Sequence, residues 1–187
     1  MKRHRETLPV FGFAASSGTG KTTLAKKVIH DLCRRGLRVA VIKHAHHDFD
    51  VDVPGKDSYE LRKAGAVQTL VSSSRRLALV TELAGSPEPS LSDLLSQLDP
   101  SRIDLVLVEG FKFEAIPKLE IRRSGHRSTP LASRDEDVIA IVTDDSALVS
   151  ETEAAALPAL DLNDTGTVAE FILSHFLGDR RVSVDVD

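Results

Sequence analysis

The eight residues from Ala15 to Thr22, which read ASSGTGKT, constrain the fold of this chain more than any other segment. The run Val10 to Ala15 that leads into them is apolar. After them, Leu24, Val28 and Leu32 recur every four residues, which is the spacing of one helix face. A glycine-rich turn between a buried strand and a helix directs successive backbone N–H groups at one phosphate. The segment therefore predicts a phosphate-binding loop, with alanine at the position of its usual first glycine.

The chemistry of such a loop assigns roles to its last residues. Gly18 and Gly20 allow the backbone to curl around a phosphate. Lys21 is predicted to reach the β and γ phosphates as a catalytic residue, and the Thr22 hydroxyl is predicted to hold Mg²⁺. These residues predict a nucleotide-binding site.

A second part of this site is predicted at Glu109, which ends the apolar run LVLVEG that begins at Leu105. An acid at the carboxyl end of a buried parallel strand lies at the same sheet edge as the phosphate loop. Glu109 is therefore a candidate catalytic residue and Mg²⁺ ligand, directly or through water. A solvated acid at a strand end is the alternative interpretation.

The remaining pattern indicates an α/β fold of the P-loop NTPase type, with a mostly parallel sheet flanked by helices. Continuous apolar runs are typical of strands buried on both faces. The expected strands are residues 10–15, 39–42, 67–71, 77–80, 105–108 and 138–142. Helices are expected between the first two strands and over residues 58–64, 91–98 and 165–177. The length of 187 residues fits a single domain over residues 1–187, with loose termini at 1–8 and 179–187.

Charge and composition narrow the setting of the protein. A net charge of −4 argues against nonspecific binding to nucleic acid or to an anionic membrane. The basic start lacks the apolar run of a signal peptide, and no segment is long enough to span a membrane. The single Cys33 fits a reducing compartment. We therefore expect a soluble cytoplasmic protein.

The segment KHAHHDFDVD, residues 43–52, concentrates histidine and aspartate after the second strand. It leaves the sheet at the edge where the phosphate loop lies. A closed zinc site is one interpretation, but Mg²⁺ is the expected metal beside a triphosphate, and it prefers carboxylate oxygens. Asp48 and Asp50 are the candidate Mg²⁺ ligands of this segment. A substrate or partner loop is the favoured interpretation, and a solvated loop is the third.

Three segments of the chain together resemble the MobB family: residues 42–66, which include KHAHHD and PGKDSYELRKAGA, and the runs ASSGTGKTTL and LVLVEGFK. This family is the molybdopterin-guanine dinucleotide biosynthesis protein B family. The resemblance implies a GTP-binding, weakly GTP-hydrolysing homodimer that assists the guanylyltransferase forming molybdopterin-guanine dinucleotide. The nucleotide site that it implies comprises Ser17, Gly18, Thr19, Gly20, Lys21, Thr22 and Thr23. The loop for a partner or for molybdopterin that it implies contains Lys43, His44, His46, His47, Asp48, Lys56 and Asp57.

Guanine selection is not carried by a familiar motif, because the sequence contains no Asn-Lys-x-Asp segment. Asp144, after the apolar run 138–142, is the candidate to accept the guanine N–H groups. A polar turn after a strand explains the same residue equally well.

Two other functions stay open at this point. In a small-molecule kinase, the histidine and aspartate segment would hold an acceptor, and an arginine lid would close over the phosphates. The candidate lid residues are Arg122, Arg123, Arg127 and Arg134. In a nucleotide-gated adaptor, hydrolysis would be incidental.

Residues 67–80 or the tail 182–184 are the candidate surfaces for a homodimer.

Overall fold

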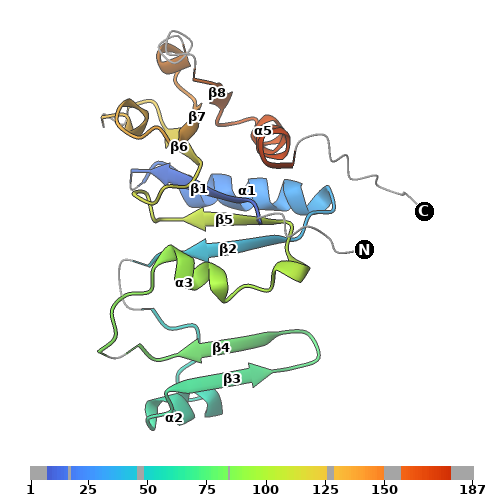
Figure 1. The fold of residues 1–187 in the computed structure, drawn as a ribbon, viewed down its shortest axis with the longest axis vertical. Coiled ribbons are helices and arrows are strands. Elements are labelled where there is room, and N and C mark those ends of the chain that lie inside the picture. The colour runs from blue at the N-terminus through green and yellow to red at the C-terminus, as the bar shows by residue number, and fades with distance from the viewer. Residues whose placement is uncertain are drawn as a thin grey trace, which may run out of the picture. The chain divides into compact units, whose positions relative to one another are not determined.

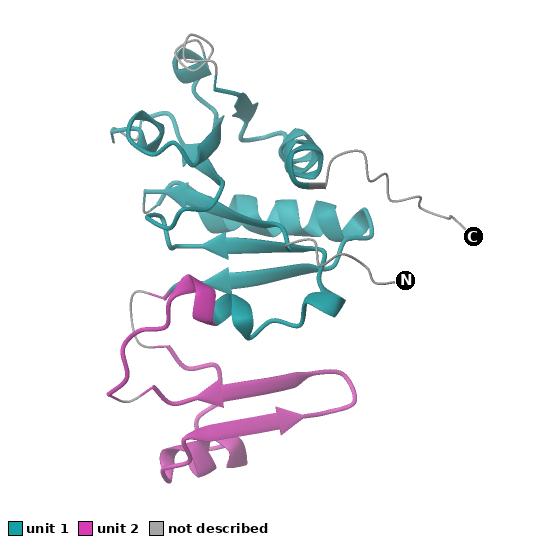
Figure 2. Cartoon of the chain, in the orientation of Figure 1, with its two compact units in different colours: residues 1–44, 94–187 teal, residues 45–93 magenta. Residues whose placement is uncertain are grey.

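The computed structural model describes residues 8–16, 18–45, 49–83, 85–125, 129–149 and 157–177. The chain separates into two compact units, one of residues 1–44 with 94–187 and one of residues 45–93 (Figure 2). The first holds the sheet that carries the phosphate loop. The single domain expected from the chain length stays a prediction.

The larger unit is built on a six-stranded sheet with the order β2-β5-β1-β6-β7-β8 (Figure 1). Every neighbouring pair of strands in this sheet is parallel. The strands are β1 (Val10–Ala15), β2 (Val39–Lys43), β5 (Leu105–Glu109), β6 (Lys118–Arg122), β7 (Val138–Thr143) and β8 (Ala159–Asp161). The predicted parallel α/β fold is confirmed.

The helices of this unit cover the sheet, and the helix that follows the phosphate loop forms as its apolar spacing predicts. They include α1 (Lys21–Arg34) and α5 (Thr165–Leu177), with short 3-10 turns at Pro100–Arg102 and Leu131–Ser133, while α3 (Leu91–Ser96) spans the boundary between the two units. In α1, Leu24, Val28 and Leu32 are buried, and Gly36 follows the helix with a φ of 86°. Helices α1 and α5 pack against each other.

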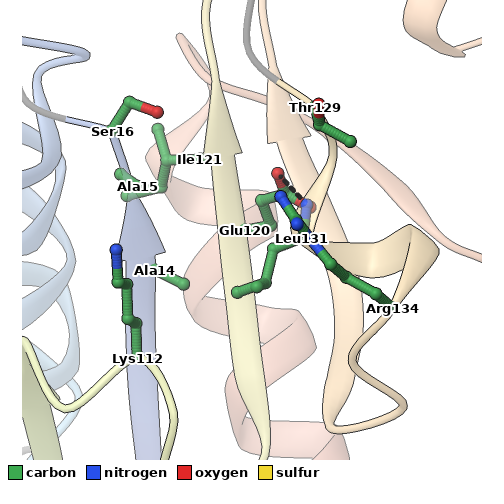
Figure 3. Close-up of a pocket in the computed structure, with 9 residues that line it drawn as sticks. All are labelled: Ala14, Ala15, Ser16, Lys112, Glu120, Ile121, Thr129, Leu131 and Arg134. Carbon is green, nitrogen blue, oxygen red and sulfur yellow. Dashed lines mark hydrogen bonds between the residues drawn. The ribbon is translucent and has the colours of Figure 1, made fainter.

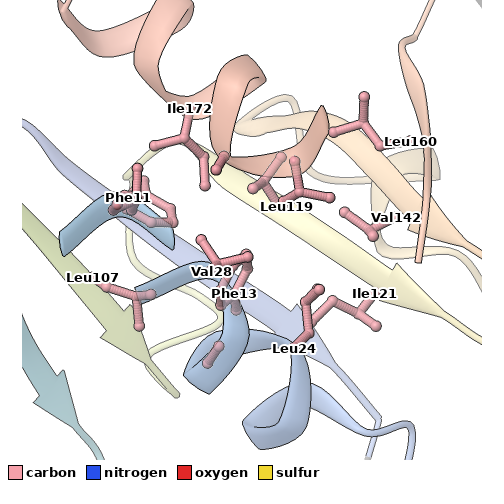
Figure 4. Close-up of a cluster of buried hydrophobic side chains, with 14 of the residues drawn as sticks. Phe11, Phe13, Leu24, Val28, Leu107, Leu119, Ile121, Val142, Leu160 and Ile172 are labelled. Carbon is pink, nitrogen blue, oxygen red and sulfur yellow. The ribbon is translucent and has the colours of Figure 1, made fainter. Parts of the chain in front are cut away.

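The apolar core lies between these two helices and one face of the sheet (Figure 4). Phe11 and Phe13 of β1 point into it, and their rings meet edge to face at 5.5 Å between centroids. Val28 of α1 and Ile172 of α5 are fully buried against them. Complete burial of each such side chain contributes about 1.5–3 kcal/mol. The core fixes α1, and with it the phosphate loop.

Strand β6 is a correction to the sequence prediction, which had no strand at residues 118–122. Its sequence, KLEIR, alternates between apolar and charged residues. Leu119 and Ile121 enter the core, while Lys118, Glu120 and Arg122 are also buried. A strand between β1 and β7 of a parallel sheet is expected to be apolar throughout, so the charges concealed it.

The smaller unit contains α2 (Asp57–Lys63), β3 (Gln68–Ser72) and β4 (Leu77–Thr81). The two strands form an antiparallel sheet in which Leu70 is opposite Leu79. Arg62 is 8% exposed and forms ion pairs with Asp50 at 2.6 Å and with Glu82 at 2.9 Å. These ion pairs connect the segment before α2 to the residues after β4. The predicted helix and both strands are confirmed within one residue at each end.

None of the helices in the described part of the chain is long and apolar enough to cross a membrane. The cytoplasmic location stays a prediction.

Candidate nucleotide-binding site

The phosphate loop connects β1 to α1 in a conformation that glycine permits. Gly18 and Gly20 have φ values of 81° and 88°, in the left-handed region that other residues rarely adopt. The buried Thr19 hydroxyl donates a hydrogen bond of 2.9 Å to the carbonyl of Ser16, which closes the loop. Ser17 lies outside the described residues. The left-handed glycines and the Thr19 side chain therefore shape this loop.

The start of α1 leaves backbone donors available at this loop. No side-chain hydrogen bond caps the helix at Gly20 within the described residues, and the first intrahelical bond of this turn runs from Leu24 N to Gly20 O. The N–H groups of Lys21, Thr22 and Thr23 precede that bond and have no partner inside the helix. Such N–H groups and the positive helix end favour an anion.

Glu109 is brought to the loop by strand pairing. Strand β5 lies beside β1, with Glu109 in register with Phe13. The Thr22 hydroxyl donates a hydrogen bond of 3.0 Å to Glu109 Oε1, and Lys21 Nζ lies 3.9 Å from the same oxygen. The side chains of Lys21, Thr22 and Glu109, which are predicted to hold phosphate and metal, therefore lie next to one another. Their roles stay predictions.

The pair Thr22 and Glu109 also fits the geometry of a magnesium ion. Adjacent oxygen ligands of octahedral Mg²⁺, each about 2.0–2.1 Å from the metal, lie about 2.9 Å apart. The two side-chain oxygens are 3.0 Å apart. A hydroxyl and a carboxylate are among the oxygen donors that this cation prefers. The spacing and chemistry of these two oxygens are compatible with Mg²⁺, and its binding stays a prediction.

A tight turn after β5 fixes the Glu109 backbone against His44. The His44 N–H donates a hydrogen bond of 2.8 Å to the Glu109 carbonyl, and its ring stacks on Phe111 at 4.8 Å. Gly110 and Phe111 both have positive φ, 98° and 48°. A Cβ at position 110 would lie 2.6 Å from the His44 Cβ, so this position requires glycine. His44 is the residue of the histidine-rich segment that the structure places at the site.

On the other side of the loop, Arg123 follows β6 and approaches Gly20. Its Nη1 atom lies 3.7 Å from the position that a Cβ on Gly20 would take. Its Nε atom is 3.4 Å from Asp144 Oδ2, and Asp144 Oδ1 accepts a hydrogen bond of 2.7 Å from the Ser124 N–H. From the sequence, Arg123 is only a candidate for an arginine lid, and strand β6, which the sequence does not predict, is what places this arginine beside the phosphate loop.

The arginine lid of the kinase hypothesis is wrong for one member. Arg122 lies in β6, is 9% exposed, and donates to Glu120 at 3.3 Å. A buried strand residue cannot close over a nucleotide. Arg127 lies outside the described residues, and Arg134 lies beyond the 3-10 turn Leu131–Ser133.

The histidine-rich segment is described only in part. Lys43 ends β2 in register with Glu109, Lys56 precedes α2, and Asp57 begins it. The predicted residues His46, His47 and Asp48 lie outside the described residues. No group of three or more histidine, cysteine or acidic side chains with metal-site geometry occurs among those that are described.

Asp50 has a structural contact that competes with its predicted metal role. The Asp52 N–H and the Arg62 guanidinium, which donates to both carboxylate oxygens, hold the pKa of Asp50 below its ordinary value. The carboxylate is therefore charged and paired. Its role as a Mg²⁺ ligand stays a prediction.

Comparison with known proteins identifies relatives that cover almost all of this chain. Residues 10–144 match the family model described as "Molybdopterin guanine dinucleotide synthesis protein B" (MobB). The "Molybdopterin-guanine dinucleotide biosynthesis adapter protein" of Escherichia coli (strain K12) is 52% identical over 168 residues, 89% of this chain and 92% of that protein. The protein of the same name from Haemophilus influenzae is 42% identical over 177 residues, 92% of this chain and 94% of that protein.

A solved structure agrees with the observed fold. The crystal structure of Bacillus subtilis MobB aligns with a TM-score of 0.69, covering 90% of this chain and 98% of that chain, at 24% identity. At this level of identity the likeness concerns the fold alone.

Proposed function

The chain belongs to the MobB family, and from this premise we propose that it is a GTP-binding adapter protein in molybdopterin-guanine dinucleotide biosynthesis. In this role it binds GTP with Mg²⁺, hydrolyses it slowly, and assists the guanylyltransferase that forms the dinucleotide. A relative that bears the adapter name is 52% identical to it over 89% of its length. The same resemblance supports the choice of GTP over ATP.

The observation that carries the nucleotide proposal is the contact between Thr22 and Glu109. Two segments distant in sequence bring a hydroxyl and a carboxylate to 3.0 Å at the N-terminus of α1. Lys21 stands beside them, and the backbone N–H groups of the first turn face the loop. Phosphate oxygens, Mg²⁺ and a water can all be held by this set.

Slow hydrolysis is part of the proposal because the resemblance to the MobB family implies it. Glu109 is the acid that the described residues place at the Thr22 hydroxyl, and it is proposed to orient the attacking water. Since hydrolysis is incidental to an adapter, we expect turnover below the roughly 1–100 s⁻¹ that is typical of kinases.

Asp144 is the proposed contact to the guanine base. It follows β7 at the edge where the phosphate loop lies, two strands from β1. Its side chain is 22% exposed and already accepts from the Ser124 N–H and pairs with Arg123. A carboxylate has acceptor capacity left for a further N–H group.

The homodimer is proposed to form through the smaller unit. Thr69 and Val80, opposite each other on one face of the hairpin, are half-buried. On the other face Leu70, Leu77 and Leu79 are 61%, 66% and 51% exposed. A two-stranded sheet by itself is only marginally stable in water. A second copy of the chain would cover its exposed apolar face.

The loop from Lys43 to Asp57 is the proposed contact to the guanylyltransferase or to molybdopterin. His44 lies at the nucleotide site, and Lys56 precedes α2 at the other end of this loop in the sequence. A loop that joins the nucleotide site to the smaller unit can report the bound nucleotide to a partner.

The nucleotide proposal is tested by calorimetry of GTP and ATP binding in the presence of Mg²⁺. The wild type is expected to prefer GTP, and Lys21→Ala is expected to weaken GTP binding by about tenfold to a hundredfold, the scale of a lost charge-assisted hydrogen bond. Lys26→Ala removes an exposed lysine of the same helix and is the control. Unchanged affinity in Lys21→Ala would remove the phosphate loop from the proposal.

The adapter proposal is tested separately by capture of the purified guanylyltransferase on the immobilised protein, with and without GTP. We expect GTP to change the amount that is retained. Retention that is equal with GTP, with ATP and without nucleotide contradicts a nucleotide-dependent adapter.

A further inference from the structure

A cavity of about 190 Å³ opens beside the phosphate loop, on its β6 side (Figure 3). Lys112, after β5, lies on one side of it, and Thr129, Leu131 and Arg134 lie on the other. Its lining comprises Ala14, Ala15, Ser16, Lys112, Glu120, Ile121, Thr129, Leu131 and Arg134. All of these residues belong to the larger unit.

The cavity is distinct from the nucleotide site. It lies between β1 and β6, whereas β5, which carries Glu109, lies on the other side of β1. Ala14 and Glu120, which pair in register, supply its floor on the sheet face opposite to Phe13 and α1. The cavity shares only the beginning of the phosphate loop, Ala15 and Ser16, with the nucleotide site.

Two cationic side chains face this cavity from opposite walls. Lys112 and Arg134 line it, and the Lys112 Nζ atom also lies 4.8 Å from the centroid of the Phe113 ring. Neither cation has an ion pair with a carboxylate among the described residues. Figure 3 shows Lys112 beside β1 and the Arg134 guanidinium across β6 from it. Two such cations that converge on one cavity create a positive potential that favours an anion.

Glu120 does not cancel this potential, because its charge is already matched. It is 5% exposed, and its oxygens accept hydrogen bonds of 2.9 Å from the N–H groups of Leu131 and Ala132. Arg122 donates to it at 3.3 Å. Glu120 therefore holds the wall that carries Arg134 in place, and a neighbouring buried arginine compensates its charge.

The position of the cavity relates its ligand to the nucleotide. Ser16 lines the cavity and its carbonyl accepts the hydrogen bond from Thr19 that closes the phosphate loop. Lys112 follows Glu109 by three residues, so the wall after β5 begins at the acid that contacts Thr22. A ligand in this cavity lies next to the phosphate end of a bound nucleotide.

We propose that this cavity binds the phosphate group of a second ligand, between Lys112 and Arg134, while the phosphate loop holds the nucleotide. The proposal rests on the nucleotide site described above for its relation to GTP. The volume is below the roughly 300–1,000 Å³ of sites that enclose a whole drug-sized molecule. The cavity therefore takes the phosphate end of a small or partly exposed ligand, with the Thr129 hydroxyl as a further polar contact.

The test uses the full chain saturated with Mg²⁺ and a non-hydrolysable GTP analogue, so that the phosphate loop is occupied. Binding of inorganic phosphate and of glycerol 3-phosphate is measured by calorimetry. We expect saturable binding at millimolar concentration or below. Lys112→Ala combined with Arg134→Ala should weaken it by at least about tenfold and change the affinity for the analogue by less than about threefold. Tighter binding of the phosphoester assigns the site to an organic phosphate, and equal affinities assign it to the free anion.

The control combines Lys27→Ala with Arg34→Ala, which removes the same two charge types from exposed positions of α1. Phosphate binding that the control reduces as much as the cavity variant does, or that the analogue competes away, would overturn the proposal. So would the absence of saturable binding. The Lys21→Ala variant separates the two sites, since it should weaken GTP binding and leave phosphate binding in the cavity unchanged. Failure of GTP binding in the wild type, with phosphate still held by Lys112 and Arg134, would contradict only the nucleotide proposal.

Discussion

The hydroxyl of Thr22 donates a hydrogen bond of 3.0 Å to Oε1 of Glu109, although the two residues are 87 positions apart in the sequence. The contact exists because β5 lies beside β1 in the sheet and ends where α1 begins. It joins the two halves of the candidate nucleotide site, and each half can be tested by a small substitution.

Replacement of Glu109 by glutamine keeps the shape of the side chain and removes its charge. We expect Glu109→Gln to leave GTP affinity within a few fold and to reduce GTP hydrolysis by at least about tenfold, because the carboxylate is proposed to orient metal-bound or attacking water. Calorimetry and a phosphate-release assay measure the two effects. Glu114→Gln, at an exposed position after β5, is the control. Equal losses of binding and hydrolysis would contradict the proposed role.

The glycine after Glu109 should be hard to replace. Gly110→Ala places a methyl group 2.6 Å from the His44 Cβ in a backbone with a φ of 98°, so both strain and overlap oppose it. We expect a loss of about 2–4 kcal/mol in the free energy of unfolding, measured by denaturant titration. In Gly65→Ala, φ is 112° and no atom lies within 4 Å of the new methyl group, so only strain applies. A loss in Gly110→Ala no larger than in Gly65→Ala would show that His44 does not fix this turn.

The strand β2 is joined to β5 at its start by Arg38 and Asp104. Arg38 Nη2 and Nε donate to the two carboxylate oxygens at 2.7 and 3.0 Å, and the Arg38 N–H donates at 2.8 Å. The side-chain hydrogen bonds from Arg38 hold the pKa of Asp104 below its ordinary value. A lowered pKa in the folded state gives stability that is fully present above the unfolded value of about 3.9 and lost as the pH falls through the lower folded-state pKa.

We therefore expect Asp104→Asn to lower the melting temperature at pH 7 by roughly 2–4 °C, the scale of one partly exposed interaction in a domain of this size. The difference from the wild type should shrink as the pH falls below about 4 and vanish when Asp104 is protonated in the folded state. Scanning calorimetry across pH measures it, with Glu136→Gln as an exposed control. A difference that does not change with pH would show that the charge of Asp104 is unimportant.

The exposed leucines of the hairpin test the homodimer. Leu79 is 51% exposed and opposite Leu70, which is 61% exposed. Leu79→Glu should convert the dimer to a monomer at micromolar concentration, because a charge in a covered apolar face is unpaired. Light scattering gives the mass. Leu61→Glu introduces the same charge at an exposed position of α2 and should leave the dimer intact. A dimer that persists in Leu79→Glu would move the interface elsewhere.

The histidines of the loop should matter after the nucleotide is bound. The backbone donors and Lys21 suffice for the phosphates, so His46→Ala combined with His47→Ala is expected to leave GTP affinity within a few fold. Formation of the guanine dinucleotide in a reconstituted mixture with the guanylyltransferase should fall. If the loop binds an anion through these imidazoles, whose ordinary pKa is about 6.5, binding should strengthen as the pH falls. Loss of GTP binding in the double variant would make the loop part of the nucleotide site.

Elements whose apolar residues follow one simple period, or that contain one fixed motif, could be predicted from the amino-acid sequence. The apolar runs of β1, β2, β5 and β7 and the four-residue spacing in α1 place strands and helix correctly, because burial on both faces or on one face leaves a direct pattern. The glycines of ASSGTGKT fix the loop by their backbone freedom, and the acid after LVLV marks the next strand end. These local patterns suffice to predict the parallel fold. They also suffice to select Lys21, Thr22 and Glu109 as candidate site residues.

Features that depend on pairing between distant segments could be found only in the folded structure. Strand β6 escaped detection because Lys118, Glu120 and Arg122 are buried on one of its faces, and burial of charge is tolerated only where partners meet it. Asp135 lies 2.9 Å from Lys118, and the N–H groups of Leu131 and Ala132 bind Glu120. No local period encodes such partners. The placement of Arg123 at the phosphate loop and the cavity between Lys112 and Arg134 both follow from that strand, so they become visible only when the chain is folded.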